Sequence, residues 1–203
     1  MNHFDQAAKS WDNNPVVWER ADAIKQHMLK RLTLNRNLTA MEFGAGTGIL
    51  SFMLKDSLKK ILLMDNSSEM VKVMEEKINL SGVTNLKPIS FDLVVNDYNA
   101  TFDLIFSQMV LHHVEDINGI ITKFYRMLNP GGQIAIADLY KEDGSFHDWM
   151  FNGHLGFDIE ELGKIIESVG FKSISHEECY VINKTSKDNI QRKYPVFLIT
   201  ATK

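Results

Sequence analysis

Three glycines, Gly44, Gly46 and Gly48, follow a short apolar run at residues 38–43. Glycines at such a turn let a ligand approach the backbone, and they permit dihedral angles that side chains disfavour. The exposed N–H groups and the dipole of a following helix favour an anionic group. The turn, with Ala45 inside it, therefore indicates a nucleotide-like ligand. A tight turn that binds nothing is the alternative.

Three acidic residues stand at the predicted carboxyl ends of successive strands. Glu42 precedes the first glycine, Asp65 closes the second strand, and Asp92 follows the third. A carboxylate in the second position accepts the ribose hydroxyls of a nucleoside. One in the third position can accept a hydrogen bond from the adenine amino group. Each Asp alone is more simply explained as a solvated turn or cap residue, but together the three acids line the crevice where doubly wound sheets bind ligands.

The spacing of the glycines separates two classes of enzyme. A dinucleotide-binding turn reads Gly-x-Gly-x-x-Gly, whereas here the third glycine, Gly48, comes one residue earlier. This spacing and the presence of Asp92 speak against a nicotinamide-dependent oxidoreductase, which stays the alternative enzyme class.

Histidines provide the candidate bases, because their ordinary pKa lies near neutrality. His112 follows the predicted fourth strand, and His147 and His154 lie beyond the fifth. A structural, hydrogen-bonded histidine is the alternative at each position. No metal site is predicted, because neither an acid nor a cysteine accompanies these histidines at metal-ligand spacing.

The elements that position these residues alternate between short apolar runs and longer amphipathic ones. Strands are predicted at 38–43, 60–64, 86–90, 102–107, 133–138, 172–183 and 195–202. Helices are predicted at 16–32, 47–55, 67–80, 115–128 and 159–169, and Phe4, Ala8 and Trp11 stand at helical spacing before them. Residues 94–100 take the place of a third crossover helix but carry only a weak pattern, and 184–193 is predicted to be a loop.

The second and fifth strands are apolar on both faces, which is typical of a central parallel sheet covered by helices. The last two strands are consecutive and predict a hairpin. The fold class is therefore α/β: a Rossmann-like, doubly wound, mostly parallel seven-stranded sheet with an antiparallel C-terminal hairpin and helices on both faces. We expect one domain, with a helical cap at 1–35, a cofactor-binding core at 36–140, an acceptor-side insert at 141–157, and the last helix and strands at 158–203.

Several motifs recur together between residues 41 and 171. They are Glu42-x-Gly44-x-Gly46-x-Gly48, Asp65-x-Ser67-x-x-Met70, Phe91-Asp92, Phe102-Asp103-Leu104-Ile105-Phe106-Ser107, Leu128-Asn129-Pro130-Gly131-Gly132 and Ser168-Val169-Gly170-Phe171. In combination they resemble the class I S-adenosylmethionine-dependent methyltransferases, in particular the methyltransferase type 11 family. Glu42 departs from the pattern, since many relatives carry Asp there.

The resemblance implies S-adenosylmethionine as cofactor and S-adenosylhomocysteine as product. The implied cofactor-binding residues are Glu42, Gly44, Ala45 and Gly46 at the methionine part, Asp65 at the ribose, Asn66 and Met70 beside the adenosine, Asp92 at the adenine amine with Phe91 and Leu93 next to it, and Ser107, Gln108 and Met109 near the sulfonium. The resemblance further implies in-line transfer of the methyl group to a small-molecule acceptor, which requires mainly alignment and exclusion of water. A base is needed only when the acceptor holds its proton.

Two further alternatives are a methyltransferase that acts on nucleic acid and a module that binds the cofactor without turnover. Methyltransferases of nucleic-acid amines usually carry Asp/Asn-Pro-Pro-Tyr/Phe after the fourth strand, where this chain has Ser-Gln-Met-Val at 107–110. A net charge of −4 with scattered cations also disfavours a nucleic-acid partner. A module that binds the cofactor without turnover stays open, because methyl transfer requires no fixed catalytic residue.

No stretch approaches the roughly 20 apolar residues that span a bilayer, and the first residues do not resemble a signal peptide. We therefore expect a cytoplasmic protein without a membrane partner. Cys179 is the single cysteine, so an internal disulfide is ruled out, and we expect it to be a buried apolar residue. The sequence sets no oligomeric state.

Overall fold

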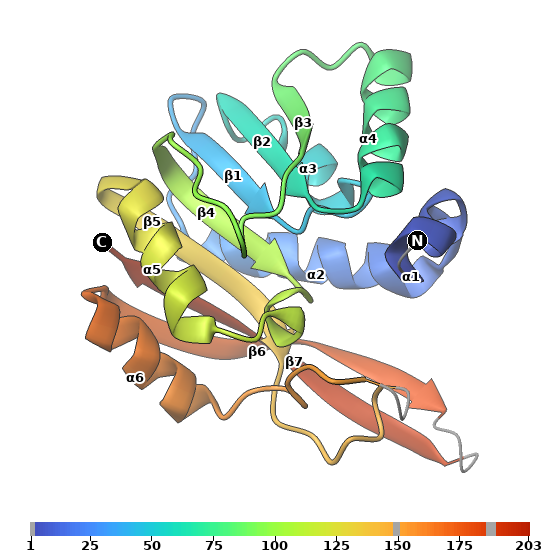
Figure 1. The fold of residues 1–203 in the computed structure, drawn as a ribbon, viewed down its shortest axis with the longest axis vertical. Helices are drawn as coiled ribbons and strands as arrows, with labels where there is room; N and C mark the ends of the chain where they lie inside the picture. The colour runs from blue at the N-terminus through green and yellow to red at the C-terminus, as the bar shows by residue number, and fades with distance from the viewer. Residues whose placement is uncertain (1–2, 148–150, 186–189) are drawn as a thin grey trace.

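The computed structural model describes residues 3–147, 151–185 and 190–203, and its centre is a seven-stranded sheet with the order β3-β2-β1-β4-β5-β7-β6 (Figure 1). The first five strands are parallel, whereas β7 runs antiparallel to both β5 and β6. The strands are β1 Thr39–Phe43, β2 Lys60–Asp65, β3 Leu86–Ser90, β4 Phe102–Gln108, β5 Leu128–Leu139, β6 Lys172–Thr185 and β7 Gln191–Thr202. The predicted fold class is confirmed.

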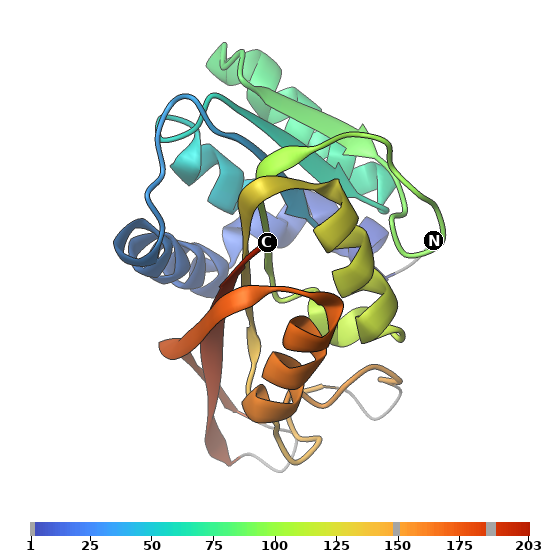
Figure 2. The same cartoon turned by 90° about the vertical axis from the view of Figure 1, so that its left-hand side faces the viewer.

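Helices cover both faces of the sheet (Figures 1 and 2). They are α1 His3–Ala7, α2 Pro15–Arg31, α3 Ile49–Leu54, α4 Ser68–Ser81, α5 Ile117–Met127 and α6 Ile159–Val169, with 3-10 turns at Ala8–Asn13 and Leu111–His113. Successive strand residues point to opposite faces. Leu63 therefore packs with α2, α3 and α4, and its neighbour Leu62 packs with α5 and α6. Strand β2 is apolar on both faces because each face packs into one of these two cores.

The third crossover, between β3 and β4, is not a helix. Asp92 instead closes a turn by accepting a hydrogen bond from the N–H of Val94 at 2.9 Å. Lys123 of α5 donates to the carbonyl oxygens of Leu93 (2.9 Å), Val94 (3.1 Å) and Asn96 (2.8 Å). These bonds satisfy backbone groups that a helix would have paired internally.

The largest differences from the predicted boundaries concern β5 and the C-terminal hairpin. The segment 128–132, which separates the predicted helix from the predicted strand at 133–138, is the first part of β5: Leu128 pairs with Phe102, and the register shifts before Gln133 pairs with Leu104. Gly131 has φ +77° at this irregularity. The C-terminal hairpin is longer than predicted, because β7 starts at Gln191 and pairs with Thr185 inside the expected loop.

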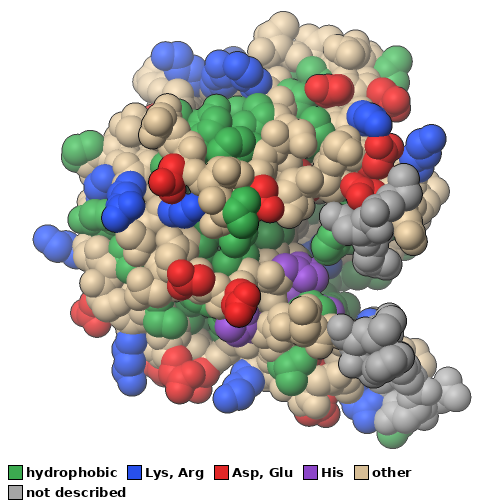
Figure 3. All heavy atoms as spheres, in the orientation of Figure 1, with side chains coloured by type: hydrophobic (Ala, Val, Ile, Leu, Met, Phe, Trp, Pro, Cys, Tyr) green, Lys and Arg blue, Asp and Glu red, His purple; other side chains and the backbone are tan. Residues whose placement is uncertain are grey.

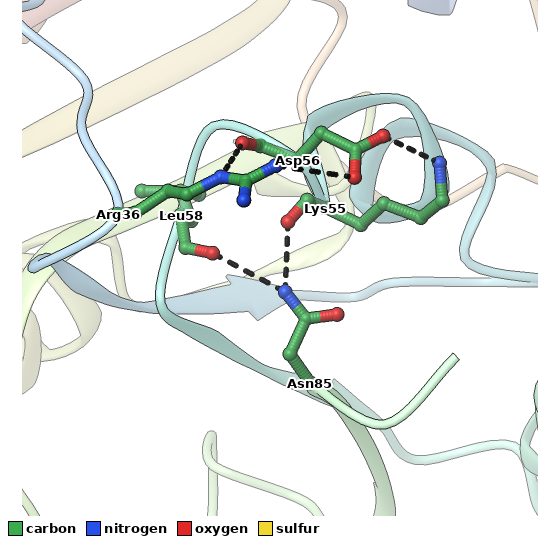
Figure 4. A network of polar contacts seen from close by, with 5 residues as sticks. All are labelled: Arg36, Lys55, Asp56, Leu58 and Asn85. Atoms are coloured by element: carbon green, nitrogen blue, oxygen red, sulfur yellow. Dashed lines mark hydrogen bonds and ion pairs between the residues drawn. The ribbon is translucent and has the colours of Figure 1, made fainter.

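A polar network fixes the loops at the amino ends of the strands (Figure 4). The side-chain amide of Asn85, just before β3, donates to the carbonyl oxygens of Lys55 (2.7 Å) and Leu58 (3.2 Å). Arg36, before β1, donates from Nε to the carbonyl oxygen of Asp56 at 2.9 Å. This edge is therefore held by structural contacts, and the site residues lie at the opposite edge.

Cys179 lies on β6 with 6% of its surface exposed, and burial raises the pKa of its thiol to about 12. The predicted buried, apolar role of this residue is confirmed. Within the described ranges, none of the helices combines the length and apolar character needed to cross a bilayer.

The packing of β2 can be tested with a matched pair of leucines. Leu63 is fully buried and Leu80 on α4 is 89% exposed. Leu63→Ala should lower the free energy of unfolding by about 2–5 kcal/mol, because it removes buried methyl groups and leaves a cavity. Leu80→Ala should change it by less than about 0.5 kcal/mol. Urea denaturation of both variants measures the difference, and similar values for the two would contradict the described core.

Candidate cofactor and acceptor site

The glycine turn between β1 and α3 has a backbone that only glycine adopts without strain. Gly44, Gly46 and Gly48 have φ values of +66°, +57° and +80°. A Cβ at Gly44 would lie 2.4 Å from Cγ2 of Val110, and one at Gly48 would lie 2.8 Å from Cδ2 of Leu63. A Cβ at Gly46 would meet no atom within 4 Å, so the backbone there borders open space. The middle glycine thus leaves room for a ligand, whereas the outer two allow close packing.

Asp65 at the end of β2 ties this turn to the start of α4. Its Oδ2 accepts the N–H of Gly46 at 2.7 Å, and its Oδ1 accepts the N–H of Ser67 at 2.8 Å. Burial raises the pKa of Asp65, although these backbone hydrogen bonds oppose the shift. Each carboxylate oxygen has a second lone pair. Asp65 can therefore accept ligand hydroxyls while it holds the turn.

Glu42 is completely buried on β1. Its Oε2 accepts a hydrogen bond from the hydroxyl of Ser51 at 2.5 Å, and its Oε1 is buried without a partner among the described residues. Burial raises the pKa of Glu42 to about 8, and the hydrogen bond from Ser51 only partly offsets this. Without a positively charged partner, the carboxyl group is therefore mostly protonated at neutral pH.

Two residues at the end of the neighbouring strand β4 carry further polar atoms that lack partners. The hydroxyl of Ser107 and Oε1 of Gln108 are both buried and unpaired among the described side chains. The next residue, Met109, has φ +54°, a strained value for a side-chain-bearing residue, as is common at functional sites. Because Glu42 pairs in register with Phe106, these atoms and Oε1 of Glu42 lie at the same edge of adjacent strands. Unpaired buried polar atoms are rare, and this group fits a polar ligand such as an amino acid moiety.

The remaining predicted cofactor residues differ in their surroundings. Asn66 and Asp92 come together, with Nδ2 of Asn66 donating to Oδ2 of Asp92 at 3.5 Å. Phe91 packs edge-on against Tyr98, with ring centroids 5.2 Å apart. The side chains of Met70 and Leu93 are each 1% exposed and belong to the interior. Ala45 lies in the glycine turn, and its N–H donates to the carbonyl oxygen of Met64 at 3.0 Å.

Of the candidate bases, His112 is the one that forms a buried acid–imidazole pair. Its Nδ1 lies 2.6 Å from Oδ1 of Asp138 at the end of β5, and both side chains are almost fully buried. A carboxylate only accepts hydrogen bonds, so Nδ1 carries the proton and Nε2 carries the lone pair. Asp138 was not predicted. The sequence pattern could have identified it, because Asp138 ends an apolar strand in the same way as Asp65 does.

The other two candidates have different surroundings. His147 stacks on Phe151 at 3.7 Å and lies 4.9 Å from the ring of His112. Burial, followed by the nearby His112 and His113, lowers the pKa of His147 to about 4. His154 donates from Nε2 to the carbonyl oxygen of Val114 at 3.0 Å, which is a structural role. Histidine side chains gather where the surface is hollowed between the N-terminal part of the molecule and the C-terminal hairpin (Figure 3).

The insert at 141–157 packs against this histidine cluster, as the contacts of His147 and Phe151 show. Gly153 allows the approach, because a Cβ there would lie 2.3 Å from the carbonyl oxygen of His112. The part of the predicted insert at 148–150, with Trp149, lies outside the described residues.

The N-terminal segment contacts the cofactor side of the molecule through groups that the sequence did not reveal. Asp12 accepts hydrogen bonds from the hydroxyl of Thr47 (2.5 Å) and from Nζ of Lys77 (2.7 Å). Asp5 accepts one from the hydroxyl of Ser67 at 2.7 Å. Figure 1 shows α1 beside the start of α4. Hydrogen bonds therefore hold the N-terminal segment against the glycine turn and against α4.

Glu42 makes the stability of the ligand-free protein depend on pH. Its pKa is about 8 in the folded chain and about 4.3 in an unfolded one. Between these values the folded state keeps a proton that the unfolded state releases, so the free energy of unfolding falls as pH rises through this window. Glu42→Gln stays neutral and should remove this part of the slope, as measured by urea denaturation from about pH 5 to pH 8. The control is Glu76→Gln on the exposed side of α4. Equal slopes for the wild type and Glu42→Gln would mean that Glu42 is ionised in the fold.

Comparison with known proteins finds a family resemblance over part of the chain. Residues 41–136 match the family described as a methyltransferase domain. An uncharacterised methyltransferase of Schizosaccharomyces pombe is 28% identical over 54% of this chain and 42% of that protein. A malonyl-[acyl-carrier protein] O-methyltransferase of Ilyobacter polytropus is 31% identical over 66% of this chain and 50% of that protein. The chain thus spans half or less of the length of these two relatives.

A solved structure supports the same assignment at the level of the fold. A SAM-dependent methyltransferase from Aquifex aeolicus superposes with a TM-score of 0.65 at 21% identity, covering 88% of each chain. The glycine turn with its acidic partners lies within or next to the matched region 41–136. Residues 41–136 therefore match a methyltransferase domain, and the fold of the chain is similar to that of a SAM-dependent methyltransferase.

Proposed function

We propose that this chain transfers a methyl group from S-adenosylmethionine to a small-molecule acceptor by in-line displacement. The observation that carries the proposal is the group of unpaired buried polar atoms on Glu42, Ser107 and Gln108 beside the open backbone of Gly46. Relatives are named for malonyl-acyl carrier protein, phosphoethanolamine and demethylmenaquinone as acceptors. That range supports a small acceptor and leaves its identity open. The cytoplasmic location stays a prediction from the sequence.

The proposed cofactor contacts keep the predicted residues and refine some roles. Glu42, Ser107 and Gln108 offer their unpaired atoms to the polar end of the methionine part, beside the backbone of the glycine turn. Asp65 offers its free lone pairs to the ribose hydroxyls, and Asp92 accepts the adenine amine next to Asn66. Met70 and Leu93 support these positions from the interior, since their side chains are buried.

The chemistry at the acceptor requires little from the protein beyond alignment. Bound S-adenosylmethionine supplies a methyl group on a sulfonium, and its thioether product leaves as the bond to the acceptor forms. The chain has to hold the acceptor in line and exclude water. When the acceptor carries a proton, Nε2 of His112 accepts it, and Asp138 keeps Nδ1 protonated and stabilises the resulting cation. His147 is the weaker candidate, because a pKa of about 4 leaves its imidazole a poor proton acceptor at neutral pH.

Calorimetric titration tests the cofactor assignment. The wild-type protein should bind S-adenosylmethionine and S-adenosylhomocysteine but not NADH. Asp65→Asn should weaken binding by about 30-fold or more, since charge-assisted hydrogen bonds to the ribose contribute about 1.5–3 kcal/mol each. Asp97→Asn is the matched control, because the Asp97 side chain is 77% exposed. Binding of NADH alone would favour the oxidoreductase, and cofactor binding without methyl transfer to any acceptor would favour a non-catalytic module.

The proposed proton acceptor can be tested once a labelled-methyl screen has identified an acceptor. His112→Gln and Asp138→Asn should lower kcat by about 10²–10⁴-fold, the range of general-base catalysis, with binding of S-adenosylhomocysteine unchanged. In both variants the rate should rise towards alkaline pH, because the acceptor then loses its proton to solvent. The exposed His176→Gln provides the control. A normal kcat in His112→Gln would remove this residue from the mechanism.

A further inference from the structure

Arg20 is a half-buried cation on α2 that forms no ion pair with the residues that the structure describes. It lies on α2 between the core residues Val17 and Ala21, and its Nε is buried without a hydrogen-bond partner among the described residues. Two other cations of the same helix have ion-pair partners: Lys25 pairs with Asp22 at 3.0 Å, and Arg31 pairs with Glu177 at 2.9 Å.

The groups that act on Arg20 are already occupied by other contacts. Burial lowers the pKa of Arg20, and the nearby Asp138 opposes this shift most. The carboxylate of Asp138, however, accepts hydrogen bonds from Nδ1 of His112 (2.6 Å), the N–H of His112 (3.2 Å) and the N–H of Leu139 (2.7 Å). Tyr180, also close to Arg20, donates its hydroxyl to Glu19. The guanidinium stays charged at neutral pH, so a positive charge remains without a dedicated acceptor.

The same Asp138 links Arg20 to the histidine cluster. Its charge acts on His147 as well as on Arg20, and His147 lies 4.9 Å from the ring of His112. Arg20 and the proposed proton acceptor therefore both lie near Asp138 at the carboxyl end of β5.

The guanidinium group of arginine binds carboxylates and phosphates through two parallel N–H groups, whose spacing matches that of two oxygens of the anion. We propose that the methyl acceptor carries an anionic group, a carboxylate or a phosphate, and that Arg20 binds it, so that the nucleophile comes close to His112. This inference rests on the proposed function and specifies its substrate class. The anionic group would accept the hydrogen bond that the buried Nε of Arg20 does not make within the described protein. A neutral substrate that binds elsewhere would leave this N–H unpaired.

The test measures thermal unfolding of the protein saturated with S-adenosylhomocysteine. Inorganic phosphate and malonate are titrated at constant ionic strength, with chloride as the reference salt and neutral glycerol as the uncharged probe. Phosphate or malonate should raise the Tm of the wild type above the chloride reference, and the arm that does so identifies the anion. Arg20→Met should lose this increase, and Arg20→Lys should retain a reduced one, because Lys keeps the charge without the fork. Arg31→Met, on the same helix but paired with Glu177, should behave as the wild type.

Two readouts separate the possible failures. Without added anion, Arg20→Met should unfold at the same Tm as the wild type or higher, since the guanidinium has no partner to lose. A clear drop in Tm would instead make Arg20 a structural residue and overturn the inference. An anion effect that is absent in the wild type, or that persists in Arg20→Met, overturns it as well. Calorimetry of S-adenosylhomocysteine on each variant shows whether the cofactor site, and with it the proposed function, has failed instead.

Discussion

The site depends on one carboxylate that joins two turns. Asp65 holds the N–H of Gly46 with one oxygen and the N–H of Ser67 with the other. Through the first contact it sets the glycine turn after β1, and through the second it sets the first turn of α4, where Ser67 caps the N–H of Met70. Parallel strands bring these points together only at their carboxyl ends. The geometry of the turn is therefore a consequence of the register between β1 and β2.

The well-packed cores allow polar atoms to stay unpaired at this edge. Helices on both faces bury central strand residues such as Leu63 and Ile105, and this packing holds the strand ends that carry Glu42 and Ser107. Such groups cost free energy in the ligand-free fold. Unpaired polar atoms held in this way are organised in advance for a polar ligand, at the expense of stability.

Much of this arrangement follows from local sequence, and the rest depends on contacts between distant residues. The alternation of apolar runs predicted the strands and the doubly wound sheet because side-chain periodicity is a local property. The weak pattern at 94–100 indicated an irregular third crossover, but its conformation was not predicted, since it depends on Lys123 of α5 reaching the carbonyl oxygens. The pairing of His112 with Asp138 likewise joins two strand ends through the β4–β5 register, which no motif encodes. The roles of the predicted cofactor residues stay predictions, whereas the positions of Glu42, Asp65 and the glycines agree with them.

The N-terminal segment has a consequence for kinetics. Its acids contact Thr47 and Lys77 beside the glycine turn, and Ser67 just after Asp65. A ligand that lies under this segment can leave only after these contacts open. In the proposed reaction, the residence time of the product nucleoside would then follow the opening rate of residues 3–12 rather than its own binding contacts alone. Higher salt weakens partly exposed ion pairs such as Asp12 with Lys77, so ionic strength would act on turnover through product release.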